Sequence, residues 1–104
     1  DLGYVGHRIL LELLRQKGAE LGEKHLDCGM LIFDQETQDT HAGGSGCACS
    51  AAVLTAHILK EINAGNLGRV LFAATGAMLS RSSTLRGESI PGISYAVSVS
   101  GEKL

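Results

Sequence analysis

The stretch THAGGSGCACSAAVLTAHILKEI, residues 40–62, organises the rest of the chain. Three glycines at positions 43, 44 and 46 lead into a run rich in Ala, Val and Leu. Glycines let a ligand or another backbone approach closely. A helix that begins near Cys49 points free N–H groups and its positive dipole end at the loop. The stretch therefore predicts either a place for an anion or an oxyanion, or a tight turn that packs a buried helix against a sheet.

Two helices are predicted from hydrophobic periodicity. Residues 49–64 are apolar on almost all sides, so we expect a central helix that is buried on most faces, with Gly65 as its C-cap. Residues 6–17 alternate apolar and charged positions at helical spacing, which predicts an amphipathic helix that ends at Gly18. His57 lies in the middle of the central helix, where a core or interface role is expected.

Three short apolar runs predict strands, at residues 28–33, 69–75 and 93–100. The first run, CGMLIF, is short and continuous, which favours a strand buried on both faces, and RVLFAAT is interpreted in the same way. A strand, a helix and a strand form a βαβ unit, which should be parallel with a right-handed crossover. The predicted fold class is therefore α/β, in the order helix-strand-helix-strand-strand around a buried central helix.

Composition limits the classes of function. The 104 residues suit one domain, and a net charge of −2 with few aromatic residues excludes a basic or base-stacking surface for nucleic acid. No apolar run reaches the length of a membrane span. Three cysteines, two of them in a C-x-C pair, suit a reducing compartment better than a zinc site. The chain begins at Asp1 without Met, so we interpret it as a fragment of something longer.

Several side chains near the glycine loop are chemically suggestive. Cys47 or Cys49 at a helix start is a candidate nucleophile, with His41 as the nearest base, although small buried thiols also fill space. His41 with Asp39 and Glu36 suits either a cation or a polar surface loop. The loop lacks the G-K-[ST] ending of a phosphate-binding P-loop.

A long segment, residues 76–92, is a candidate functional loop because it is rich in Ser and Thr and carries two arginines. The guanidinium groups of Arg81 and Arg86 match carboxylates in geometry. Together with the helix start they would hold a small dicarboxylate, and by themselves they would be solvated loop charges.

With these elements in place, the chain resembles a known family. The runs DCGMLIFDQETQDTHAGGSGCACSA, RVLFAATGAMLS and GESIPGISYAV resemble the C-terminal part of the stage V sporulation protein AD family over nearly the whole chain. The resemblance implies a thiolase-like fold, of which residues 1–104 would be a fragment of the C-terminal half forming a single domain. The family is not known for acyl transfer. From the residues themselves we expect no metal site, and we expect no cofactor.

The resemblance also implies a function. The family takes part in moving dipicolinic acid, pyridine-2,6-dicarboxylate, with its calcium into the developing spore. Its member would be a peripheral protein at the spore inner membrane, beside membrane proteins of the stage V sporulation A group, with a link to germination. The expected ligand-binding residues are His41, Gly43, Gly44, Ser45, Gly46 and Cys47, with Ser80, Arg81 and Arg86.

The chain departs from thiolase-type enzymes in ways that weaken an enzymatic role. Such enzymes place a reactive His or Asn in the matching loop, whereas His41 precedes the glycines, and the half that carries their nucleophilic Cys is missing. An incomplete sheet exposes an edge, so we expect a homo-oligomer. Two alternatives to acid binding stay open. One is acyl transfer or thioester hydrolysis by Cys47 or Cys49, and the other is a structural module that docks spore membrane proteins.

Overall fold

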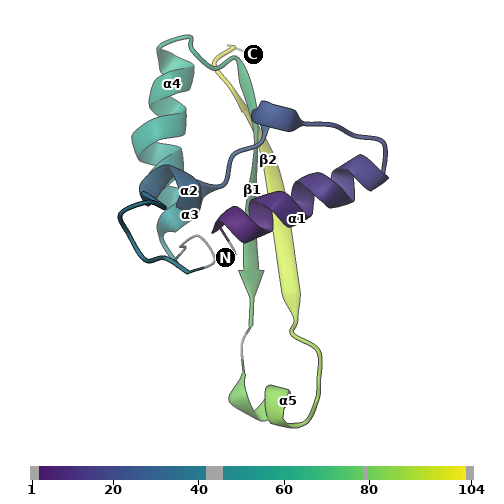
Figure 1. Ribbon diagram of the computed structural model, residues 1–104. Helices are drawn as coiled ribbons and strands as arrows, with labels where there is room; N and C mark the ends of the chain where they lie inside the picture. Colours follow the sequence, from purple (N-terminus) through teal and green to yellow (C-terminus); the bar gives the residue numbers. More distant parts are fainter. Residues whose placement is uncertain (1–2, 42–45, 79, 103–104) are drawn as a thin grey trace. The chain divides into compact units, whose positions relative to one another are not determined.

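A computed structural model describes residues 3–41, 46–78 and 80–102 (Figure 1). The chain divides into two compact units, Asp1–Lys60 and Glu61–Leu104. The elements are α1 (Gly3–Gln16), a 3-10 turn η1 (Gly22–Lys24), α2 (Cys28–Ile32), α3 (Cys49–Val53), a π-helical turn η2 (Leu54–Ile58), α4 (Leu59–Asn63), β1 (Arg69–Ala77), α5 (Arg81–Leu85) and β2 (Gly92–Ser100). Helices and a two-stranded sheet are consistent with the α/β class, and the thiolase-like half stays a prediction.

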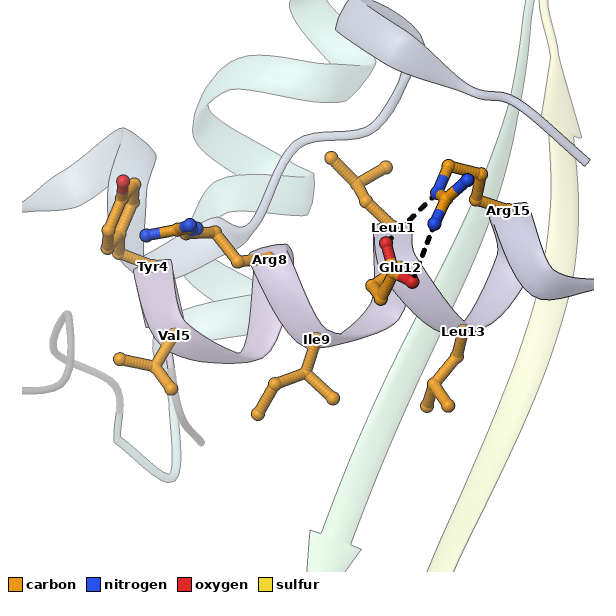
Figure 2. Close-up of a pocket in the computed structure, with 8 residues that line it drawn as sticks. All are labelled: Tyr4, Val5, Arg8, Ile9, Leu11, Glu12, Leu13 and Arg15. Atoms are coloured by element: carbon orange, nitrogen blue, oxygen red, sulfur yellow. Dashed lines mark hydrogen bonds and ion pairs between the residues drawn. The ribbon is translucent and has the colours of Figure 1, made fainter.

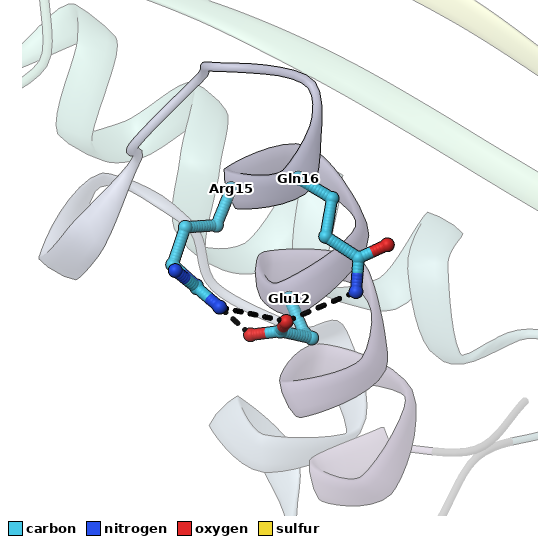
Figure 3. A network of polar contacts seen from close by, with 3 residues as sticks. All are labelled: Glu12, Arg15 and Gln16. Carbon is cyan, nitrogen blue, oxygen red and sulfur yellow. Dashed lines mark hydrogen bonds and ion pairs between the residues drawn. The ribbon is translucent and has the colours of Figure 1, made fainter.

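The amphipathic helix is confirmed as α1, and it ends where expected. Gly18 has a φ of +81°, and the N–H of Ala19 donates to the carbonyl of Leu14 at 2.9 Å. This is the bonding pattern of a glycine C-cap. On the exposed side, the Glu12 carboxylate accepts hydrogen bonds from Arg15 at 2.9 and 3.0 Å and from Gln16 at 3.0 Å (Figure 3).

The strand predicted over residues 28–33 is wrong, because α2 forms there instead. The Asp27 carboxylate accepts from the N–H of Gly29 at 2.8 Å and of Met30 at 3.3 Å, and the N–H of Phe33 donates to the carbonyl of Gly29 at 3.0 Å. A carboxylate at the N-cap satisfies amides that a helix start leaves unpaired. The apolar run itself does not distinguish a short strand from a helical turn, and the cap decides for the helix.

The central helix is confirmed in position but not in burial. It is built from α3, η2 and α4 in succession, and among the described residues its buried side chains form one stripe: Val53 (4% exposed), Ile58 (9%) and Ile62 (6%). The expectation of burial on most faces is therefore wrong. Small residues such as Ala51 and Ala52 are exposed, because alanine is tolerated on either side of a helix.

The π-helical turn explains the unusual spacing of that stripe. The N–H of Leu59 donates to the carbonyl of Leu54, five residues earlier, and Thr55 Oγ1 donates to the carbonyl of Ala51 at 2.8 Å. A hydroxyl that bonds back into its helix bends the backbone, and a π turn takes up one extra residue. Val53 and Ile58, five apart, thereby come to the same side. The helix ends as predicted at Gly65, whose φ is +79°.

The parallel βαβ unit is wrong, because β1 and β2 form an antiparallel pair. Their register runs without interruption from Arg69↔Ser100 to Ala77↔Gly92. With the first run helical, the next strand in the chain is the available partner, and a hairpin joins antiparallel strands directly. In β1 the residues Val70, Phe72 and Ala74 are half-buried and their neighbours exposed, so the strand has one sheltered face and not the two expected.

The segment between the strands contains the short helix α5 in addition to a loop. Ser80 caps it, since its Oγ accepts from the N–H of Ser83 at 3.4 Å and its carbonyl accepts from Thr84 Oγ1 at 2.9 Å. Further on, the N–H of Met78 donates to the carbonyl of Pro91 at 2.9 Å. The hairpin is thus closed at the base of this segment, and α5 lies beyond it (Figure 1).

Candidate functional site

The loop that leads into α3 belongs to the unit Asp1–Lys60. Gly46 and Cys47 are exposed, and the N–H of Cys49 donates to the carbonyl of Gly46 at 3.0 Å, which forms a turn at the helix start. Ala48 is the N-cap and provides no side-chain acceptor. Gly43, Gly44 and Ser45 lie outside the described residues. The structure therefore confirms that a helix begins at Cys49, and its N-cap residue Ala48 supplies no side-chain hydrogen bond to the first amides.

The length of the helix behind this start matters for its electrostatics. Three five-residue segments, α3, η2 and α4, follow one another from Cys49 to Asn63. Peptide dipoles aligned over such a length place partial positive charge at the first turn. Since the N-cap residue Ala48 supplies no side-chain acceptor to this turn, a carboxylate of a ligand is a suitable acceptor for its N–H groups.

His41 is held by its own carboxylate neighbour. Its Nδ1 lies 3.2 Å from Asp39 Oδ1, its backbone N–H donates to the same oxygen at 3.3 Å, and its φ is +51°. The side chains are 88% and 83% exposed. Within the described part of the chain, no group of three His, Cys, Asp or Glu residues is arranged to hold a metal ion. His41 is thus a surface imidazole whose orientation Asp39 sets.

Ser80, Arg81 and Arg86 belong to the other unit, Glu61–Leu104. Ser80 is used as the cap of α5, and its Oγ lies 2.9 Å from that of Ser82. Arg86 Nη1 lies 3.9 Å from Glu88 Oε1, with both side chains more than half exposed. Arg81 is exposed at the first position of α5. The two arginines are accessible to a carboxylate, whereas Ser80 has a structural role.

The three cysteines differ in access. Cys47 is exposed and Cys28 and Cys49 are half-buried, and all three are free. Burial raises the pKa of the Cys28 thiol, and the nearby Cys49 and Asp27 raise it further. Cys28 therefore has little thiolate at neutral pH, and the thiolate is the reactive form.

Alkylation with iodoacetamide should follow this order of access. We expect Cys47 to be modified first and Cys28 last, with the modification of Cys28 rising only at strongly alkaline pH. Peptide mapping by mass spectrometry against pH measures it. Modification of Cys28 ahead of Cys47 would contradict the placement of α2.

A histidine pair was missed in the sequence because its members are 18 residues apart. His7 of α1 and His25 ahead of α2 stack with ring centroids 4.9 Å apart, and their Nδ1 atoms are 2.7 Å apart. Such a hydrogen bond requires one nitrogen to be unprotonated. Burial lowers the pKa of His25, and repulsion by His7 lowers it further, against attraction by Asp27.

This pair predicts a loss of stability in acid. The unfolded chain protonates His25 near the ordinary value of 6.5 while the folded chain resists protonation, so stability falls as the pH drops through 6.5 and levels off below the folded pKa. Since His25 is only half-buried and solvent screens its charge, we expect less than about 1 kcal/mol. Urea denaturation at a series of pH values should show a shallower acid slope for His25→Gln than for the matched His41→Gln. Equal slopes would contradict the pairing.

Two hollows lie on the unit Asp1–Lys60. One, of about 290 Å³, is lined by α2 and the central helix through Leu31, Ile32, Ala52, Val53, Ala56 and His57. The other, of about 700 Å³, is lined by side chains of α1 alone, with Val5, Ile9 and Leu13 pointing to one side of the helix (Figure 2). The second is the open surface of one helix. The first has a mostly apolar wall with one imidazole and contains none of the predicted site residues.

Comparisons with known proteins agree on one family. Residues 1–100 match the family model described as stage V sporulation protein AD. A protein named stage V sporulation protein AD from Bacillus subtilis (strain 168) is 46% identical over 97 residues, which cover 93% of this chain and 28% of that protein. The chain spans less than a third of the length of the curated relative it matches.

Proposed function

Because the chain belongs to the stage V sporulation protein AD family, we propose that it is a sporulation protein that binds dipicolinic acid, or its calcium chelate, for uptake into the developing spore. The observation that carries the proposal is the start of α3, where a helix that continues through η2 and α4 begins after the turn at Gly46 and where the N-cap residue Ala48 supplies no side-chain hydrogen bond. Dipicolinate is a dianion, and its carboxylates accept from backbone N–H groups.

The position in the cell forms part of the same proposal. We place the chain at the spore inner membrane as a peripheral protein beside membrane proteins of its sporulation group. No helix within the described residues has the length and apolar character that a membrane crossing needs.

The arginines of the second unit give a separate carboxylate-binding candidate. Arg81 and Arg86 flank α5 and are exposed, and guanidinium groups form paired hydrogen bonds with carboxylates. Arg86 must exchange its long contact with Glu88 for the ligand, while Arg81 is better placed at the exposed first position of α5.

Calorimetry with dipicolinate tests this candidate. If Arg81 pairs with a carboxylate, Arg81→Ala removes a charged hydrogen bond worth about 1.5–3 kcal/mol. The dissociation constant for dipicolinate should then rise at least about tenfold. Arg8→Ala in α1 is the matched control for loss of one positive charge, and it should bind as the wild type does. Equal affinities for all three proteins would remove Arg81 from the site and leave the α3 start as the proposed one.

An acyl-transfer role with Cys47 or Cys49 as the nucleophile is the second candidate, because the Cys47 thiol is exposed just ahead of α3. Rapid alkylation of Cys47 at a pH well below about 8.5, the pKa of a free cysteine, would favour this role. A third candidate is a structural module that docks membrane proteins. In that case the chain should capture those proteins in a pull-down equally well with and without dipicolinate.

A further inference from the structure

The strand β2 carries an apolar row that the described residues leave exposed. Ile93 is 57% exposed, Tyr95 69% and Val97 57%. Because alternate residues of a strand share a face, these three lie together, beside Phe72 and Ala74 of β1 in the register. The opposite face of β2 carries Ser94, Ala96 and Ser98. The two faces of β2 therefore differ, with large apolar side chains on one and small side chains on the other, where Leu71 of β1 lies opposite Ser98.

The outer edge of β2 is equally open. The sheet has two strands, and within the described residues β2 pairs with β1 alone. From Gly92 to Ser100 there is no charged residue and no proline, and the continuous register shows no bulge. Charged residues, prolines and bulges are the features by which proteins block the pairing of an edge strand, and β2 has none of them. A two-stranded hairpin in water is only marginally stable, so this edge favours pairing.

We propose that β2 pairs antiparallel with β2 of a second copy of this chain, across a two-fold axis. The register that overlaps the whole strand is centred on Ala96, and it sets Tyr95 opposite Val97 of the partner subunit. Residues paired in this way keep to the same face, so the apolar rows of the two copies join into one. The product is a four-stranded sheet in the order β1-β2-β2-β1.

The observations favour a second copy over a different protein. A neutral strand meets no like charge when it pairs with itself, and in the register centred on Ala96 its apolar row meets an identical apolar row. A two-fold contact of this kind uses the same patch on both subunits. The surface is independent of the α3 start, so dimerisation and acid binding can fail separately.

Sedimentation equilibrium of the whole chain tests the proposal. At micromolar concentration the wild type should have twice the mass of one chain. Val97→Lys places a charge in the apolar row and should weaken the dimer at least about tenfold, while Ser98→Lys, on the opposite face of the same strand, should leave it a dimer. Far-UV circular dichroism shows whether each variant keeps its hairpin.

Hydrogen exchange gives a readout that needs no variant. In the dimer, alternate amides of β2, those that point away from β1, should exchange at least about tenfold more slowly at high protein concentration than at low. A wild type that stays monomeric, or a dimer in which β2 exchange does not depend on concentration, overturns the proposal. The first result would rule out the pairing of β2 with itself, and the second would assign the dimer to another surface.

Discussion

Replacing Ile62 with alanine is expected to lower the free energy of unfolding by about 2–4 kcal/mol. Ile62 is 6% exposed and is one of three buried hydrophobic side chains among the described residues. Its Cγ2 lies against Gly101, where an added Cβ would come within 3.1 Å of it. The lost methyl groups leave a cavity that a backbone packed this closely cannot fill. Such a loss is a large part of the stability of a small domain.

Urea denaturation followed by circular dichroism measures the effect. Leu59→Ala is the matched control, because Leu59 lies on the same helix α4 but is 36% exposed, and it should cost less than about 1 kcal/mol. Equal losses at the two positions would contradict the burial of the Ile62 stripe and with it the role given to the π-helical turn.

Adding a methyl group at Gly46 is expected to weaken dipicolinate binding about tenfold without changing stability. A Cβ built at Gly46 meets no atom of the described residues within 4 Å, so we expect Gly46→Ala to cost the folded chain little. A ligand that contacts this backbone would be displaced by the methyl, and a steric conflict of this kind costs about 1–3 kcal/mol. Calorimetry with dipicolinate gives the affinity, and thermal denaturation gives the stability.

Gly68→Ala is the matched control for Gly46→Ala, since a Cβ at Gly68 also meets nothing within 4 Å. It should leave both affinity and stability unchanged. Unchanged affinity in Gly46→Ala would mean that the ligand does not contact the loop at this point.

Local signals in the sequence were sufficient for some elements. The periodicity of α1 and the glycines at positions 18 and 65 predicted where two helices end, because a left-handed residue at a helix end favours glycine. Both β1 and β2 were predicted as strands from their apolar composition. These features depend on neighbouring residues, so they can be recognised without the rest of the fold.

Features that depend on competition or on distant partners were not predicted. The Asp27 cap turned an apolar run into α2, and the loss of that strand left β1 to pair antiparallel with β2. The π turn arises where Thr55 donates a hydrogen bond back to Ala51, and the hydrophobic periodicity of the sequence does not predict it. The contact of His7 with His25 needs the tertiary fold.

The candidate site was partly predictable. The helix start at Cys49 follows from the change from glycines to apolar residues, and it is confirmed. From the sequence, Ser80, Arg81 and Arg86 were predicted to act together as ligand-binding residues. In the structure Ser80 caps a helix, whereas the two arginines are accessible. Residues of this kind look alike in sequence because their hydrogen bonds decide their roles.

An amide NMR titration with dipicolinate tests the central claim most directly. If the start of α3 binds the acid, the backbone N–H signals of residues 46–51 should shift together and saturate, since the N–H groups there donate to the carboxylates. Acetate at the same ionic strength is the control for general charge effects. If the N–H signals of residues 46–51 do not shift, the account is contradicted, whether or not the signals of other residues shift.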